Sequence, residues 1–166
     1  MNASEKIMAL EALQALREQW RRDAQTVVFT NGCFDILHRG HVEYLEKARS
    51  LGDRLILGLN SDASVFRLKG EGRPIVPEQD RAAILAALAS IDAVVLFGED
   101  TPARLIETLL PDYLVKGGDY RPEDIVGAEA VLQNGGAVTT IPFLENRSTT
   151  TVIQRIIELT KNGVLH

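Results

Sequence analysis

Two hydrophobic patterns alternate along the chain. Short apolar runs, typical of strands that are buried on both faces, are separated by longer stretches in which apolar residues recur three and four positions apart, as on one face of a helix. The predicted strands are 26–30, 54–59, 93–97, 113–116 and 137–141. The predicted helices are 4–22, 41–51, 78–89, about 103 to 110, about 128 to 134, and 149–160.

This alternation predicts the fold class. Parallel strands joined by helical crossovers form a sheet that is covered on both faces, so we expect an α/β, Rossmann-like, doubly wound five-stranded parallel sheet with helices on both faces. No shift in composition marks a boundary, and residues 1–166 are therefore expected to form a single domain, with 1–25 as a helical extension and 26–160 as the catalytic core. Ligands of such sheets bind beyond the carboxyl ends of the strands, which directs attention to the residues that follow each strand.

Composition narrows the possible partners and surroundings. A formal net charge of -5 argues against a nucleic-acid partner, which favours a basic face. Cys33 is the only cysteine, so an internal disulfide is impossible and a reducing compartment is favoured. Charged residues interrupt the N-terminal segment, which therefore differs from a signal peptide, and no apolar stretch is long enough to span a bilayer. We expect a soluble, cytoplasmic protein with no membrane or nucleic-acid partner.

The turn after the first predicted strand, TNGCFDILHRGH, carries two histidines. It has neither the Gly-x-Gly-x-x-Gly pattern of dinucleotide-binding turns nor a P-loop. His38 and His41 are three residues apart at a helix start, so they share one helix face beside free backbone N–H groups, and Gly32 and Gly40 would let a phosphate approach the backbone. Three interpretations remain open: incidental surface or capping residues, a metal site with Asp35 as third ligand, and a triphosphate site.

Two further groups of candidates follow the second predicted strand. Asn60 opens the sequence Asn-Ser-Asp, which reads as a helix cap. Lys69 and Arg73 belong to a glycine-rich loop, RLKGEGRP, which either closes cations over phosphates or carries ordinary surface charge. Arg81 stands in the first turn of a predicted helix, where a cation is unfavourable to the helix dipole; this conflict suggests a functional role.

The last candidates follow the fourth and fifth predicted strands. Lys116 ends an apolar run and precedes two glycines, a favourable position for binding phosphate. The segment that begins at Arg147 is rich in hydroxyl groups and opens a helix, so Ser148 or Thr149 is either a plain N-cap or part of another anion site.

Four segments carry a family resemblance. NGCFDILHRGH resembles the His-x-Gly-His signature of the cytidylyltransferase-like nucleotidyltransferase superfamily, and NRSTT resembles its second motif, Ile-Ser-Thr-Thr, with Arg147 in place of the isoleucine. Together with GLNSD and LVKGGDY, these segments resemble the heptose 1-phosphate adenylyltransferases, a branch of that superfamily, over residues 26–157. The resemblance implies direct transfer from ATP to a sugar phosphate, with release of pyrophosphate and with Mg²⁺ expected, in a protein that is expected to be a homodimer.

The resemblance also implies roles for particular residues. The catalytic residues would be His38, His41 and Lys116, with no protein metal site, and Cys33 would be a small buried side chain rather than a nucleophile. Residues for the substrate phosphate would be Asn60, Lys69, Arg81 and Lys116. The nucleotide would be bound by Asn31, Gly32, Cys33, Phe34, His38, Gly40, His41, Gly117, Asp119, Arg147, Ser148, Thr149 and Thr150. The alternatives are a cytidylyltransferase for glycerol 3-phosphate or a similar phosphorylated alcohol, and a non-catalytic nucleotide-binding regulatory module.

Overall fold

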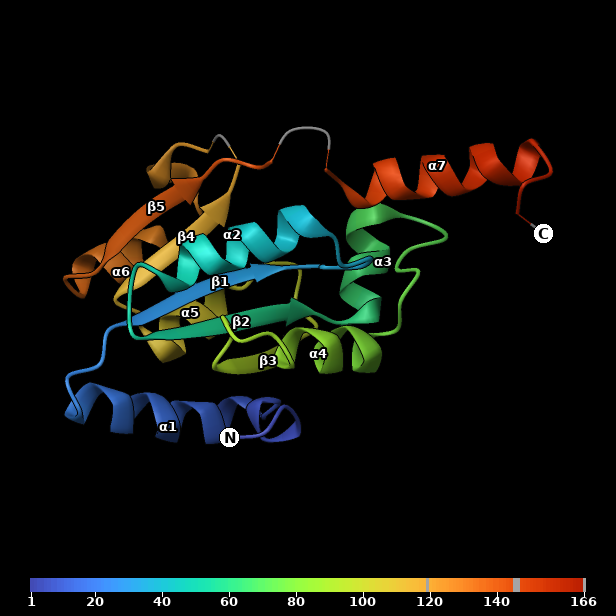
Figure 1. Cartoon of the computed structure of the whole chain (residues 1–166). Coiled ribbons are helices and arrows are strands. Elements are labelled where there is room, and N and C mark those ends of the chain that lie inside the picture. The colour runs from blue at the N-terminus through green and yellow to red at the C-terminus, as the bar shows by residue number, and fades with distance from the viewer. Residues whose placement is uncertain (119, 145–146, 166) are drawn as a thin grey trace.

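A five-stranded parallel sheet forms the centre of the protein (Figure 1). The computed structural model describes residues 1–118, 120–144 and 147–165. The strands run in the order β3-β2-β1-β4-β5, and every pair of neighbours is parallel. Their bounds are β1 Val27–Gly32, β2 Arg54–Asn60, β3 Ala93–Phe97, β4 Tyr113–Gly117 and β5 Ala137–Ile141. The expected sheet is therefore confirmed.

Helices cover both faces of this sheet, as predicted. One buried apolar cluster joins residues of α1, α5 and α6 to the sheet, and a second joins residues of α2 and α4 to it. Alternate β1 residues serve the two clusters, with Phe29 in the first and Val28 in the second. The helices are α1 Leu10–Arg22, α2 Arg39–Arg49, α3 Asp62–Lys69, α4 Glu78–Ala86, α5 Ala103–Leu109, α6 Ala128–Gln133 and α7 Thr149–Lys161, with 3-10 turns at Ser4–Lys6 and Pro122–Asp124.

The N-terminal segment differs from the predicted helix 4–22. Its first residues form a 3-10 turn, and Ile7 then makes a parallel bridge to Val94 at the edge of the sheet. Met8 donates its backbone N–H to Val94 O over 3.0 Å, so pairing with the edge strand delays the helix until Leu10. Leu13 and Trp20 of α1 are buried in the core, which makes this helix part of the packed body of the protein.

Helix α3 was not among the predicted helices: its first residues were expected only as a helix cap, and its last three, Arg67 to Lys69, were expected in the glycine-rich loop. Ser61 begins it as an N-cap that accepts a hydrogen bond from Ser64 N over 3.3 Å, which confirms the capping interpretation of this sequence. Phe66 and Leu68 are both exposed, so the apolar residues of this helix do not form the buried stripe by which a helix is recognised in a sequence.

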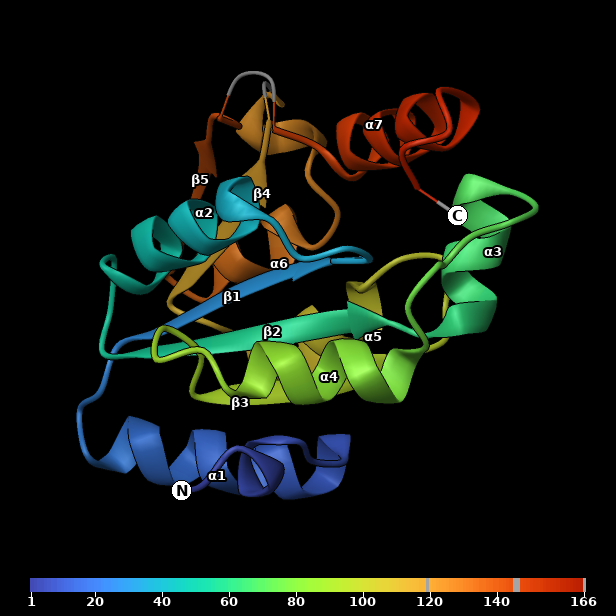
Figure 2. The same cartoon turned by 45° about the vertical axis from the view of Figure 1, so that its right-hand side comes forward.

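Helix α7 projects away from the sheet beyond the carboxyl ends of the strands (Figures 1 and 2). It has 13 residues, and none of them is buried. Ser148 caps it by accepting a hydrogen bond from Thr151 N over 3.1 Å. Across the described residues, no helix combines the length and the apolar character that crossing a membrane requires.

Candidate active site

A cavity of about 910 Å³ lies at the carboxyl ends of the strands, where the fold class predicts a ligand. Its lining comes from the ends of β1, β2 and β4, the start of α2, the end of α3 and the start of α7. Arg81 does not line it, and Asp119 lies outside the described residues. The expected site residues that do line it are Asn31, Gly32, Cys33, Phe34, His38, Gly40, His41, Asn60, Lys69, Lys116, Gly117, Arg147, Ser148, Thr149 and Thr150.

The two histidines form a stacked pair within this cavity. Their ring centroids are 3.8 Å apart and the planes are inclined by 23°. His38 is the N-cap residue of α2, yet its side chain makes no capping hydrogen bond, so the capping interpretation is wrong. Within the described part of the chain, Nδ1 of each ring is buried without a hydrogen-bond partner. Buried polar atoms rarely remain unpaired, so the pair is suited to a polar ligand.

Burial makes both imidazoles hard to protonate. It lowers the pKa of His38, and it lowers the pKa of His41 to about 4, with a further contribution from the neighbouring His38. The pair is therefore neutral at neutral pH. A phosphate placed beside it would favour the protonated form, because an adjacent negative charge raises the pKa of an imidazole.

Packing beneath the histidines gives the two glycines a different role from the one expected. Phe34 adopts a left-handed conformation, with φ of 45°, and its ring lies 5.0 Å from that of His41. A Cβ on Gly32 would come within 2.8 Å of the Phe34 ring, and one on Gly40 within 3.0 Å of the His38 ring. Both glycines thus make room for the protein's own rings, and close approach of a phosphate to them stays a prediction.

Lys116 and Cys33 line the same cavity as this pair. Nζ of Lys116 donates to Oδ1 of Asn31 over 3.4 Å. Burial lowers the pKa of Lys116, and the charge of Lys69 lowers it further. Cys33 is only partly buried, so the expectation of a buried side chain is wrong. Desolvation still raises the pKa of its thiol, which stays protonated at neutral pH, and the absence of a nucleophilic role stays a prediction.

Asp35 is not placed to be a metal ligand. Its Oδ1 accepts the backbone N–H groups of Ile75 and Val76, each over 2.8 Å, and its Oδ2 accepts Nε of Arg73 over 2.6 Å. Burial alone would raise the pKa of this carboxyl, but these hydrogen bonds outweigh it and hold the pKa below its usual value. In the described ranges, no group of three or more histidine, cysteine or acidic residues could hold a metal, so the metal interpretation of this turn is not supported.

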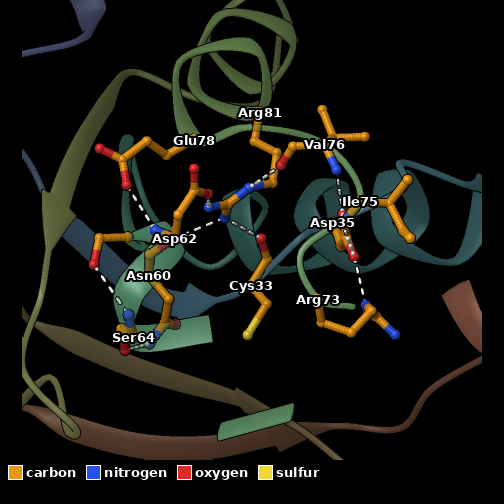
Figure 3. A network of polar contacts seen from close by, with 11 residues as sticks. Cys33, Asp35, Asn60, Asp62, Ser64, Arg73, Ile75, Val76, Glu78 and Arg81 are labelled. Carbon is orange, nitrogen blue, oxygen red and sulfur yellow. Dashed lines mark hydrogen bonds and ion pairs between the residues drawn. The ribbon is translucent and has the colours of Figure 1, made fainter. Parts of the chain in front are cut away.

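Arg81 does not line the cavity, and its guanidinium group is bound instead to neighbouring segments of the protein (Figure 3). Its side chain is almost wholly buried. It donates Nε to Val76 O over 2.9 Å, Nη1 to Cys33 O over 2.6 Å and to Asn60 O over 2.9 Å, and Nη2 to Oδ1 of Asp62 over 2.7 Å. These backbone carbonyls explain why a cation is tolerated in the first turn of α4. Arg81 holds three segments together, and direct contact with phosphate stays a prediction.

Some of the other lining residues were expected from the sequence, and others were missed. Ser148 is the N-cap of α7, which confirms the capping interpretation, and it also lines the cavity; its part in an anion site stays a prediction. Lys69 and Arg73 also line the cavity, which favours the functional interpretation of their loop. Lining residues that follow β3, β4 and β5 were missed, although their places after strands were a usable signal; these are Asp100, Thr101, Pro102, Tyr120 and Phe143.

Comparison with known proteins agrees with this geometry. Residues 29–155 match the model of the family described as cytidylyltransferase-like. The chain is similar to the bifunctional protein HldE of Syntrophotalea carbinolica, with 59% identity over 158 residues that cover 95% of this chain and 32% of the relative. The protein of the same name from Geobacter metallireducens is 58% identical over 152 residues, which cover 92% of this chain and 31% of the relative. The chain thus spans about a third of the length of these curated relatives.

Solved structures show the same architecture. The lipopolysaccharide core biosynthesis protein from Thermoplasma volcanium aligns with a TM-score of 0.58 and 28% identity, covering 74% of this chain and 99% of that one. Pantothenate synthetase from Thermus thermophilus aligns with a TM-score of 0.59 and 17% identity, covering 95% of this chain and 76% of that one. The second likeness concerns the fold alone.

Proposed function

The chain belongs to the cytidylyltransferase-like family, and on that premise we propose that it is an adenylyltransferase that joins ATP to D-glycero-β-D-manno-heptose 1-phosphate. The products would be ADP-heptose and pyrophosphate. The observation that carries the proposal is the stacked pair of His38 and His41, which shares one cavity with Lys116 and with the start of α7. At about 910 Å³, this cavity has room for both substrates.

The choice of a heptose phosphate rests on the relatives and on the motifs. Matches of 55 to 59% identity carry the name bifunctional protein HldE, and a structural neighbour is described as a lipopolysaccharide core biosynthesis protein. The segments LVKGGDY and NRSTT resemble the heptose branch of the superfamily. This chain matches about a third of the length of those relatives, so the proposal concerns only the activity carried by the matched third.

The proposed reaction is a direct transfer. An oxygen of the sugar phosphate attacks the α-phosphorus of ATP in line, the new P–O bond forms, and the bond to the bridging oxygen of the β-phosphate breaks, so that pyrophosphate leaves with the electron pair. Such reactions need positioning and charge stabilisation more than covalent help. His38 and His41 would bind phosphate oxygens of ATP, and the half-buried cation of Lys116 would offset the charge that develops in the transition state.

We also expect Mg²⁺ to accompany ATP, where it would neutralise charge on the phosphates. The described residues include no cluster of three metal-ligating side chains. That donor set fits an ion held chiefly by the substrate, since Mg²⁺ at nucleotide sites is usually bound by phosphates and water with few protein ligands. The protein's own contribution would be to bind and orient the phosphates around it.

We further propose that the protein works in the cytoplasm, where ATP and sugar phosphates are present, and that it is a homodimer. The single cysteine, Cys33, is compatible with a reducing compartment. Light scattering of the purified chain would test the oligomeric state, and a mass of one chain of 18.2 kDa would contradict the dimer.

Pyrophosphate release tests the proposed reaction. The protein would be incubated with D-glycero-β-D-manno-heptose 1-phosphate and, in parallel, with ATP, CTP or GTP. Release with ATP alone supports the proposal. Release with CTP and glycerol 3-phosphate, but not with the heptose ester, would instead support the cytidylyltransferase alternative, and binding of ATP without turnover of any acceptor would support a regulatory module.

His41→Ala is the matching variant for the site. We expect kcat to fall about a hundredfold or more, which is typical for loss of one preorganised group at a transition state. The melting temperature should change little, because Nδ1 of His41 makes no hydrogen bond within the described structure. Arg39→Ala is the control, since Arg39 is exposed, pairs with Glu43 and does not line the cavity. Wild-type turnover in His41→Ala would contradict the catalytic assignment.

A further inference from the structure

The cavity holds a second group of cations in addition to the histidine pair. Lys69 ends α3, Arg73 lies in the segment that follows, and Lys116 is the next-to-last residue of β4; all three line the same cavity as Cys33. Lys69 and Arg73 come from one short stretch of the chain, and their charges both oppose the rise in the pKa of the Cys33 thiol that burial causes. Cationic side chains thus reach the cavity from a segment separate from the histidine pair, which suits a reaction between two phosphorylated substrates.

Arg73 is held by one edge of its guanidinium group. Its Nε donates to Oδ2 of Asp35 over 2.6 Å, and the side chain of Asp35 is 1% exposed (Figure 3). In the structure as described, Nε is the only nitrogen of Arg73 with a hydrogen-bond partner. The two terminal nitrogens therefore remain available at the cavity, where a guanidinium group can bind a phosphate through two parallel hydrogen bonds.

Asp35 is itself fixed, which makes it a firm anchor. Its carboxylate accepts the backbone N–H groups of Ile75 and Val76, and Val76 O in turn accepts Nε of Arg81 over 2.9 Å. The other end of the segment is open to its surroundings: Gly70 and Gly72 have φ of 87° and 83°, and a Cβ on either would meet no atom within 4 Å. The position of Arg73 is thus set from the side of Asp35.

We propose that Arg73 binds the phosphate of the acceptor substrate and that Asp35 is the residue that positions it. This inference rests on the proposed function. The histidine pair and the hydroxyl-rich start of α7 lie next to each other, since a Cβ on Gly40 would come within 3.3 Å of Cβ of Arg147, and they suit the phosphates of ATP. The cations at Lys69 and Arg73 come from the segment after β2, on the other side of β1 from β4, and suit the second phosphate.

Binding measurements test the proposal without requiring turnover. Calorimetry would give the Kd of ATP and, separately, of D-glycero-β-D-manno-heptose 1-phosphate and of inorganic phosphate. For Arg73→Ala we expect the Kd of both phosphate probes to rise at least about tenfold, the effect of losing a charge-assisted hydrogen bond, while the Kd of ATP changes less than about twofold. Arg104→Ala, an exposed arginine of α5 outside the cavity, should leave all three values unchanged.

Asp35→Asn tests the positioning role. It should weaken phosphate binding in the same direction, and adding it to Arg73→Ala should cause no further weakening, because Asp35 acts through Arg73. Should Asp35→Asn fail to fold, Arg73→Lys is the second variant: it keeps the charge but loses the planar fork, and we expect the same selective weakening.

The outcomes separate the inference from the proposed function. Equal weakening of ATP and phosphate, a loss confined to ATP, or no change in Arg73→Ala would overturn the assignment of Arg73. If the wild type binds inorganic phosphate through Arg73 but does not bind the heptose ester, the proposed substrate fails while the Arg73 site stands.

Discussion

Replacing Arg81 by methionine is the most informative perturbation of this fold. The substitution keeps a long, flexible side chain in the buried space but removes every donor. Four hydrogen bonds are lost, three to the backbone carbonyls of Val76, Cys33 and Asn60 and one to Asp62. Arg81→Met thus separates a structural role for this residue from direct binding of phosphate.

The expected cost follows from these contacts. A buried acceptor left without a partner costs about 1–3 kcal/mol, and removing one partner of a buried ion pair costs about 3–5 kcal/mol. The side chain of Asp62 is 41% exposed and can return to water, so the three carbonyls account for most of the loss. We expect the free energy of unfolding to fall by about 3–5 kcal/mol and the melting temperature by roughly 6–20 °C for a chain of this size.

Urea unfolding followed by circular dichroism would measure this difference, with ATP affinity measured on the same variants. Asp62→Asn is the control and should cost less than about 1 kcal/mol, because its carboxylate is partly solvated. If Arg81→Met unfolds within about 1 kcal/mol of the wild type and yet binds ATP at least tenfold more weakly, the structural reasoning is refuted. Arg81 would then be a phosphate ligand, as expected from the sequence.

Two further predictions concern stability. The pKa of His41 is about 4 in the folded protein and near 6.5 in the unfolded chain, so the unfolded chain takes up a proton first as the pH falls from 7 to 4. The free energy of unfolding should therefore drop by up to about 3 kcal/mol over that range. In a plot of the urea midpoint against pH, His41→Asn should flatten this part of the curve. Trp20→Ala should lower the free energy of unfolding in urea by about 3–5 kcal/mol, because Trp20 lies in the core and is 5% exposed. Arg22→Ala, at an exposed position of the same helix, should change it little. A near-neutral Trp20→Ala would show that α1 contributes little to the core.

Short-range signals were sufficient to predict much of this protein. Each strand was found from a local apolar run, and His38 and His41 were found because the residues that carry the signature are adjacent in the chain. The start of α1 was placed too early, since the bridge from Ile7 to Val94 joins segments that are far apart in sequence.

The supporting contacts of the site could not be predicted in the same way. Arg81 bonds to backbone carbonyls, and every residue has a carbonyl, so no residue type marks its partners. Asp35 was considered as a metal ligand because carboxylates often are, and only the fold reveals that Ile75 and Val76 reach it. Helix α3 was not predicted because Phe66 and Leu68 are exposed, so its apolar residues do not form a buried stripe along one face.

Helix α7 has a consequence for how tightly a nucleotide can be held. Its first turn supplies hydroxyl groups to the cavity, but none of its 13 residues is buried and only a few are partly buried. Helices of this length with so little tertiary packing are marginal in water. Part of the binding free energy from any contact with Ser148 or Thr149 is therefore offset by the cost of ordering the helix. The observed affinity is then the affinity of the ordered form multiplied by the fraction of molecules in which the helix is formed. Amide hydrogens of α7 should exchange quickly in the free protein and slowly with ATP bound. Loss of pyrophosphate would let the helix fray, so that the departure of this product and the loosening of α7 become one event.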